Sequence, residues 1–236
     1  MAPSSRPNRC FAIGDIHGCD VALKVLLEAV DLQPQDTLIT LGDYINKGPG
    51  AKTVLDTLIA LHAQGQLIPL RGNHEIFLRT AGKYGKTRLN GKDLVDRKTL
   101  VSYSPTRKPA SLSDIPEDHW RFIQEKCLDW WETDRHIFVH ATLAPDKPLS
   151  EQPDKSLFWD KFTDPQPHMS GKTWICGHTP QKNGRPRNLG YAICLDTWVY
   201  GKGWLTGLDV DSGQVWQASQ RGKLQTAKIE DFREGS

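Results

Sequence analysis

The sequence lacks the segments that mark a membrane or disulfide-rich protein. Its longest apolar runs have the length of single strands, too short to cross a bilayer. Its five cysteines are odd in number and form no Cys-x-x-Cys pair, which disfavours a disulfide framework or a zinc knuckle. The formal net charge of +2 neither favours nor excludes a polyanionic partner. These absences predict a soluble cytoplasmic protein with reduced thiols, without membrane contact or sequence-specific nucleic-acid binding.

Length and composition favour one folded domain. A chain of 236 residues with 38% hydrophobic and 25% charged residues is sufficient for one sizeable α/β core. Residues 1–9 are rich in Pro, Ser and Arg and have no signal-peptide core behind them, so we expect a disordered tail there. The prediction is a single domain over 10–225, followed by a polar tail over 226–236. The oligomeric state stays open.

Short β-rich runs alternate with segments of helical periodicity in the first half of the chain. This alternation predicts a largely parallel sheet flanked by helices. We expect helices over 21–30, 51–62 and 116–127, and strands over 10–13, 37–41, 67–70, 136–139, 173–176, 191–195, 204–210 and 215–218.

Residues of metal-binding type follow these strands. The segments 14–18 (GDIHG), 42–43 (GD) and 72–75 (GNHE) each come directly after a strand, and two later strands end at His140 and His178. Asp, His and Asn supply oxygen and nitrogen ligands, and the carboxyl ends of parallel strands meet at one edge of a sheet. Asp15, Asp43 and Asn73 taken singly could be ordinary turn residues. Taken together with the histidines, they predict a two-metal site at that edge.

The segment 82–112 interrupts the pattern. Between residues 82 and 108 it carries eight Lys or Arg against two acids, and its apolar periodicity is faint. We therefore expect an insertion outside the core. Two interpretations stay open: a solvated loop or short helical excursion, and a basic lid over an anionic substrate.

The ordered motifs resemble those of a known family. The set Gly-Asp-x-His-Gly, Gly-Asp-x-x-x-x-Gly, Gly-Asn-His-Glu, Val-His and Gly-His-Thr over residues 13–179 is similar to that of calcineurin-like metallophosphoesterases. Within them it resembles the phosphoprotein phosphatase group, which includes symmetrical diadenosine tetraphosphatases. The resemblance implies a β-sandwich flanked by helices, with the metal site at the carboxyl ends of the strands. It also implies two divalent ions, Mn in vitro, with Fe or Zn as alternatives.

The resemblance assigns a role to each motif residue. It makes Asp15 and His17 ligands of the first ion and Asp43 the bridge between the ions. It makes three further residues ligands of the second ion, namely Asn73, His140 and His178. His74 would be the general acid that protonates the leaving oxygen after attack by a metal-bridging hydroxide.

Two positions depart from the family pattern. The family has an aspartate that holds the general acid and an arginine that grips phosphate, whereas this chain has Asn46 and Lys47. An amide can accept a hydrogen bond from imidazole but gives no charge to imidazolium, and Lys cannot make the bidentate fork of Arg. Lys161, in Trp159-Asp160-Lys161, lies where bacterial relatives often carry a second phosphate-binding arginine, or is an exposed lysine on a turn.

Three functions follow from these motifs. The leading hypothesis is a phosphoprotein phosphatase, of Ser/Thr or Tyr type, acting on phosphomonoesters of a protein or small molecule. The alternative is a dinucleoside tetraphosphate or polyphosphate hydrolase, since Asn46 and Lys47 should matter less when the leaving group is itself a phosphate. The third is a degenerate phosphatase that acts as a binding protein. If Asn46 takes the place of the family's aspartate beside His74, Asn46→Asp should speed the hydrolysis of alkyl phosphates, because a carboxylate would favour protonated His74.

Overall fold

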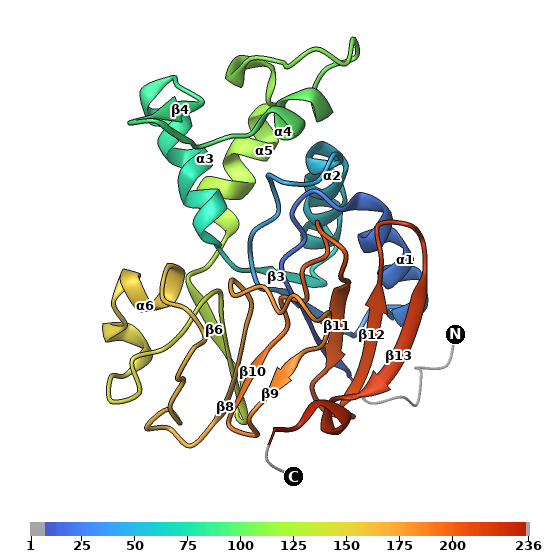
Figure 1. Ribbon diagram of the computed structural model, residues 1–236, viewed down its shortest axis with the longest axis vertical. Coiled ribbons are helices and arrows are strands. Elements are labelled where there is room, and N and C mark those ends of the chain that lie inside the picture. The colour runs from blue at the N-terminus through green and yellow to red at the C-terminus, as the bar shows by residue number, and fades with distance from the viewer. Residues whose placement is uncertain (1–7, 235–236) are drawn as a thin grey trace.

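Two β-sheets form the centre of the molecule (Figure 1). The computed structural model describes residues 8–234, so most of the predicted N-terminal tail lies outside the described residues. One sheet has the strand order β13-β12-β11-β1-β2-β3, with β1 (Cys10–Ile13), β2 (Thr37–Thr40), β3 (Leu67–Pro69), β11 (Leu205–Asp209), β12 (Gln214–Ala218) and β13 (Leu224–Lys228). The other has the order β6-β7-β8-β10-β9, with β6 (Trp130–Glu132), β7 (His136–Val139), β8 (Thr173–Cys176), β9 (Arg187–Asn188) and β10 (Ala192–Cys194).

Each sheet is parallel at its centre and antiparallel at its margins. β1, β2 and β3 pair in parallel, and so do β7, β8 and β10. β11, β12 and β13 extend the first sheet with antiparallel pairs, while β6 and β9 do so for the second. The prediction of one largely parallel sheet is therefore wrong. Alternation along the chain cannot tell whether a crossover returns to the same sheet or opens a second one.

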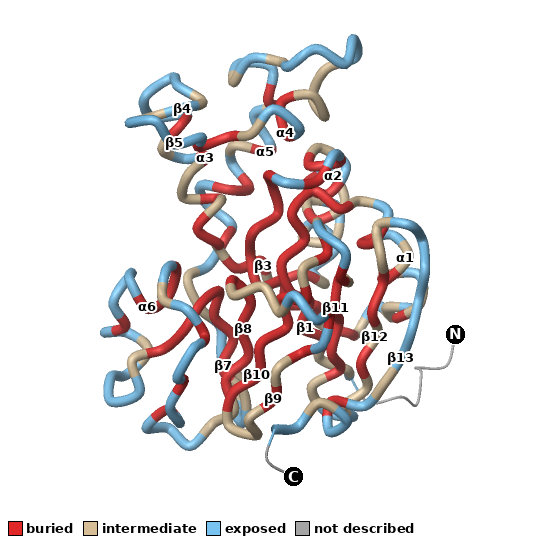
Figure 2. The backbone as a smooth tube through the Cα atoms, viewed as in Figure 1, coloured by how far each residue is buried: buried red, intermediate tan, exposed pale blue. Residues whose placement is uncertain are grey.

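The two sheets pack face to face, as the predicted β-sandwich requires. Alternate residues of each strand point to opposite faces, so Ala12 and Ile39 enter one buried cluster with Phe138 and Ile175 of the other sheet. Figure 2 shows buried backbone along both sheets and into the loops beyond their strands. The predicted β-sandwich is thereby confirmed.

Helices cover the outer faces of the sandwich. On the first sheet, α1 (Asp20–Val30) and α2 (Ala51–Ala63) bury their apolar faces in a cluster with Phe11 and Ile13. On the second sheet, α6 (Asp154–Phe158) packs with Trp174 and Cys176. The predicted helix over 116–127 is divided into α5 (Glu117–Arg121) and a π-helical turn, η2 (Phe122–Lys126). No helix in the described range 8–234 is long and apolar enough to span a membrane.

The segment 82–112 is built of small elements that contribute to the core. It contains the end of α3 (Asn73–Tyr84), the hairpin strands β4 (Arg88–Leu89) and β5 (Lys92–Asp93), and α4 (Arg97–Ser102). A 3-10 turn, η1 (Leu112–Asp114), follows it. Leu94, Val95 and Leu100 are buried in the same cluster as α1 and α2. The expectation that this segment lies outside the core is wrong, because three apolar side chains dock it while its many basic residues obscure the pattern.

The C-terminal part also differs from its prediction. Residues 226–228 belong to edge strand β13, whose backbone pairs with β12 from 224 to 228, and η4 (Ile229–Phe232) follows with Ile229 buried. An edge strand with polar side chains has little hydrophobic alternation, so composition alone suggests a tail. At the other end Asp36 holds Arg9, accepting from its backbone N at 3.1 Å and from its Nε at 3.0 Å, so Arg9 is not part of a disordered tail.

Candidate metal centre

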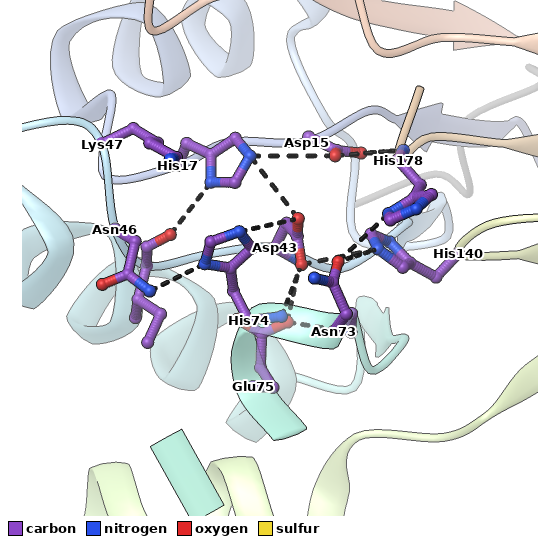
Figure 3. Close-up of polar contacts among 12 residues, drawn as sticks. Asp15, His17, Asp43, Asn46, Lys47, Asn73, His74, Glu75, His140 and His178 are labelled. Carbon is purple, nitrogen blue, oxygen red and sulfur yellow. Dashed lines mark hydrogen bonds and ion pairs between the residues drawn. The ribbon is translucent and has the colours of Figure 1, made fainter. Parts of the chain in front are cut away.

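The predicted ligands converge at one edge of the sandwich (Figure 3). Asp15 and His17 follow β1, Asp43 follows β2, and Asn73 begins α3 after β3. His140 follows β7 and His178 follows β8, so two of the predicted ligands come from the second sheet and the others from the first. The sandwich therefore brings together residues separated by more than a hundred positions.

Asp43 lies at the middle of the cluster. Its Oδ2 is 3.5 Å from His17 Nε2, and its Oδ1 is 3.5 Å from His140 Nε2. Two groups of potential ligand atoms, each within 4.8 Å of one another, share this carboxylate: one with His17 and His74, the other with His140 and His178. Such sharing is the geometry that a bridging carboxylate needs. Asp15 adjoins the first group, with Oδ2 4.0 Å from His17 Nε2.

The imidazoles are oriented by backbone carbonyls. His17 Nδ1 donates to the Ile45 carbonyl at 3.0 Å, and His140 Nδ1 donates to the Leu41 carbonyl at 2.8 Å. His178 Nε2 lies between the Trp159 carbonyl, at 3.2 Å, and Lys161 Nζ, at 3.3 Å. A carbonyl only accepts, so in the His17 and His140 rings Nε2 carries a lone pair that is available to a metal.

Electrostatics at the cluster favour a cation. Burial lowers the pKa of His17 to about 4 and, with nearby His140, lowers the pKa of His178 to about 3, so these rings stay neutral and able to bind metal. Burial and the neighbouring carboxylates Asp196 and Asp43 raise the pKa of Asp15 well above its usual value. Buried carboxylates beside neutral imidazoles are unfavourable alone and are relieved by divalent ions. The residues present therefore fit a metal centre.

Asp196 is a member of the cluster that was not among the predicted ligands. It follows β10, is 1% exposed, and its Oδ2 has no hydrogen-bond partner among residues 8–234. Burial raises the pKa of Asp196 to about 7. An unpaired buried oxygen beside Asp15 is a further sign that a cation belongs here. The pattern that identified the other ligands, a strand followed by a polar residue, was present at this position too.

Glu75 is a second residue whose role the sequence did not reveal. Its carboxylate accepts from three backbone N–H groups, those of Asp43 at 2.7 Å, Tyr44 at 2.8 Å and Gly72 at 2.9 Å. It thus ties the loop after β2 to the start of α3. Burial and nearby Asp43 raise the pKa of Glu75 to about 8. The available signal was a glutamate three residues after Gly72, the spacing of a capping box.

Close backbone approach requires glycine at position 72. A Cβ on Gly72 would lie 2.2 Å from Asp43 Oδ1 and 2.4 Å from the Asp43 backbone nitrogen.

Asn46 and Lys47 have positive φ angles of 66° and 72°, so the loop after β2 carries backbone strain that its surroundings must offset.

Asn46 contacts His74, and its amide orientation is determined by its surroundings. Its Oδ1 accepts from the Asp96 backbone N–H at 2.8 Å, while its Nδ2 donates to the Leu94 carbonyl at 3.2 Å. A flipped amide would face both groups with the wrong atom. Nδ2 therefore donates its second proton to His74 Nδ1 at 2.7 Å. Asn46 thus donates to the imidazole instead of accepting from it, and the proton of neutral His74 lies on Nε2.

The two predicted phosphate-binding lysines lie in different settings. Lys161 Nζ is 3.3 Å from His178 Nε2, so its side chain reaches the cluster. Lys47 is exposed, and its backbone N donates to Asp96 Oδ2 at 2.6 Å. The Phe77 ring lies between those of His74 and Trp159. Its centroid is 5.5 Å from the centroid of His74 and 5.3 Å from that of Trp159.

A family profile and several known proteins are similar to this chain in sequence. The sequence profile described as Calcineurin-like phosphoesterase matches residues 9–182. A protein named symmetrical bis(5'-nucleosyl)-tetraphosphatase from Paracidovorax citrulli (strain AAC00-1) is 30% identical over 132 residues, covering 52% of this chain and 46% of the relative. The protein of the same name from Acidovorax ebreus (strain TPSY) is 40% identical over 84 residues, covering 35% and 29%. The matched segments thus span less than half of these relatives.

Solved structures share the fold at lower identity. A proposed diadenosine tetraphosphatase has a TM-score of 0.65 at 21% identity, with 95% of each chain covered. A protein serine/threonine phosphatase from Saccharomyces cerevisiae has a TM-score of 0.60 at 16% identity, covering 96% of this chain and 81% of that one. The profile match over 9–182, together with the sandwich and the clustered ligands, shows that this chain belongs to the calcineurin-like phosphoesterase family.

Proposed function

We propose that this metallophosphoesterase hydrolyses dinucleoside polyphosphates at a phosphoanhydride bond. One observation carries the proposal: relatives that match this chain at 30–40% identity are named symmetrical bis(5'-nucleosyl)-tetraphosphatases. Neighbours named as protein phosphatases are below 25% identical and support the fold alone. The leading hypothesis from the sequence, a phosphoprotein phosphatase, therefore gives way to its alternative.

The proposed metal ligands follow the geometry of the cluster. Asp15 and His17 would hold one divalent ion, Asn73, His140 and His178 would hold the other, and Asp43 would be shared. Two such ions would supply a net positive charge and lower the pKa of water at the centre. Mn is the ion we expect to support activity in vitro, because Asp, Asn and His suit it, as they also suit Fe and Zn.

The residues around the ligands would handle the leaving group. His74 is proposed as the general acid, with Nε2, the nitrogen 3.9 Å from Asp43 Oδ2, as its donor. Because Asn46 donates to Nδ1, the neutral ring can offer its one proton from Nε2 as a hydrogen bond, whereas full proton transfer requires the imidazolium form, which an amide N–H disfavours. Lys47 and Lys161 are proposed to contact phosphate. A phosphate leaving group needs less protonation than an alkoxide, so an amide partner for His74 impairs anhydride cleavage less than ester cleavage.

A substrate panel tests this function. The Mn-loaded protein is incubated with diadenosine tetraphosphate, inorganic polyphosphate, a mononucleotide and a phosphopeptide, and the products are separated by chromatography. Symmetrical cleavage of diadenosine tetraphosphate predicts ADP as its main product. Turnover of phosphopeptide without turnover of either anhydride would overturn the proposal in favour of a protein phosphatase.

The variant Asp43→Asn tests whether the centre itself is responsible. Removing the shared carboxylate should abolish turnover of every substrate on the panel, and chelation of the wild-type protein should do the same. If the wild-type protein bound these substrates and turned none over with Mn, Fe or Zn, the hypothesis of a degenerate binding protein would replace this one.

A further inference from the structure

A basic cavity adjoins the metal centre. It has a volume of about 640 Å³, and its walls come from the loop after β10, from the β12–β13 turn and from the loop that carries Lys47. Gly207 pairs with Ile13 at the end of β1, and Leu205 pairs with Ala218 at the end of β12. The β12–β13 turn therefore lies at the same edge of the sheet as the ligands that follow β1 (Figure 1).

The charge of the cavity has one sign. Its lining contains five basic residues and no acidic one: Lys47, Lys98, Lys202, Arg221 and Lys223. Two carboxylates outside the lining, those of Asp20 and Asp96, accept hydrogen bonds from lining residues. Asp20 accepts from Gln220 Nε2 at 2.9 Å, and Asp96 accepts from the backbone of Lys47.

None of these five cations is in an ion pair with another residue of the described range 8–234. Lys98 Nζ donates to the carbonyl of Lys47 at 2.7 Å. A concave surface with several unneutralised cations attracts a compact polyanion more strongly than a single phosphate.

The walls of the cavity are held in place. Gln220 anchors the β12–β13 turn on the start of α1, because its Oε1 accepts from the Ala22 backbone N–H at 3.1 Å. The loop after β10 is tightly closed, since a Cβ on Gly203 would lie 1.9 Å from the Thr197 carbonyl oxygen. The basic residues thus project from anchored backbone, which lowers the ordering cost of binding.

Two residues link the cavity to the metal centre. Tyr200 lines the cavity and also contacts His17, with ring centroids 4.8 Å apart in an edge-to-face arrangement. Lys47 lines the cavity and directly follows Asn46, the partner of His74. An anion that leaves the centre past Tyr200 would enter the basic cavity.

We propose that this cavity binds the linear oligophosphate chain of the substrate, beyond the phosphoryl group that is attacked at the metal centre. The proposal rests on the proposed function and adds a ligand class: substrates with a chain of three or more phosphates. A phosphomonoester is too short to use the cavity. The oligophosphate can belong to a dinucleotide or to inorganic polyphosphate, and the experiment below separates these sources.

The double variant Lys202→Gln/Arg221→Gln tests the cavity without changing a proposed metal ligand. Loss of two phosphate contacts should raise KM for diadenosine tetraphosphate about tenfold, since each charge contributes a modest, partly screened interaction. KM for p-nitrophenyl phosphate should rise less than about twofold, because a single phosphate does not reach the cavity. Equal changes in both KM values would overturn the proposal.

A matched control removes the same two charges elsewhere. Arg135 immediately precedes β7, and Lys228 ends β13 at the edge opposite the β12–β13 turn. Arg135→Gln/Lys228→Gln should leave the ratio of the two KM values as in the wild type. If this control shifted the ratio as far as the cavity variant does, net charge rather than the cavity would be responsible, and the proposal would fail.

A second assay separates the cavity from the proposed function. Inorganic tripolyphosphate is used as an inhibitor of p-nitrophenyl phosphate hydrolysis, and the cavity variant should need about tenfold more of it. Free Mn is held constant across the tripolyphosphate series, so that chelation does not contribute to the difference between wild type and variant. If the wild type does not cleave diadenosine tetraphosphate but this shift appears, the dinucleotide function fails and the cavity stands as a site for inorganic polyphosphate. If no shift appears in either assay, the cavity proposal fails.

Discussion

At the scale of single residues, the loop after β2 depends on contacts from the segment 82–112. Asn46 receives its orientation from Asp96 and Leu94, and Thr99 Oγ1 accepts the Asn46 backbone N–H at 2.9 Å and donates to its Oδ1 at 3.2 Å. These bonds hold a residue with positive φ that would otherwise be strained. Through Asn46 they also orient His74.

Replacement of Asn46 by aspartate should change which substrates are favoured. A carboxylate would accept a proton from His74 Nδ1 and stabilise the charged imidazole, so hydrolysis of alkyl phosphate should rise about tenfold relative to aryl phosphate. The new oxygen would face the Leu94 carbonyl, now 3.2 Å from Nδ2, which should lower stability. Steady-state rates on both esters, with metal content measured, check this. Equal changes on both esters would contradict the role of His74.

Thr99→Val tests the support of Asn46. The near-isosteric change leaves the buried Asn46 N–H unpaired, and we expect unfolding free energy to fall by about 1–3 kcal/mol. Because the loop loosens, kcat on poor leaving groups should fall more than kcat on aryl phosphate. Thr99→Ser keeps the hydroxyl and should retain the wild-type ratio of these rates. A serine variant that behaves like valine would show that packing, not the hydroxyl, matters.

At the scale of elements, hydrogen bonds from a loop residue, Asp36, hold the start of β1 in place. Asp36, after α1, accepts from Gln33 N at 2.9 Å and from Arg9 Nε at 3.0 Å, and so fixes the start of β1 beside β2. Burial opposes the charge of Asp36, but these hydrogen bonds outweigh burial and lower its pKa. Asp36, which lies outside any strand, thereby helps to set the register between β1 and β2.

The lowered pKa of Asp36 predicts how stability depends on pH. Asp36→Asn should reduce the unfolding free energy by about 1–2 kcal/mol at pH 7. A lowered folded-state pKa gives stability that is present above the unfolded pKa, about 3.9, and is lost as pH falls through the folded value. The difference between wild type and variant should therefore shrink below about pH 4. Urea unfolding of both proteins checks this, with exposed Asp134→Asn as control.

Elements with strong periodicity could be predicted from the sequence. The strands that begin at Cys10 and His136 and the helix α2 agree with the structure because one apolar face or run defines each. The edge strand β13 and helix α4 could not be predicted. Their stability comes from backbone pairing with β12 and from a few buried contacts, which composition does not record.

At the scale of the whole molecule, the sandwich buries three acidic side chains. Asp15, Asp43 and Asp196 are all buried, and each comes shortly after a strand, β1, β2 and β10 respectively. Bound cations would neutralise them and connect ligands from both sheets. The metal is therefore expected to stabilise the fold as well as to support activity.

Removal of metal should lower the melting temperature. Free Mn at about a hundred times its dissociation constant adds about 2.7 kcal/mol to the unfolding free energy, so chelation should reduce Tm by several degrees and Mn should restore it. In Asp43→Asn the Mn effect on Tm should be small. Differential scanning fluorimetry measures both. If Mn did not change the Tm of the wild type, this result would contradict a metal centre at this edge of the sandwich.

The ligand types, their order and their positions after strands follow from the sequence, since each depends on a few neighbouring residues. Glu75, Asp196 and the link between Asn46 and Thr99 became visible only in three dimensions. The physical reason is that hydrogen bonds and burial depend on which strands become neighbours. The sequence by itself determined a metallophosphoesterase with its candidate ligands. Only the tertiary structure decided that two sheets share the centre, that Asn46 donates to His74, and that a basic cavity lies beside His17.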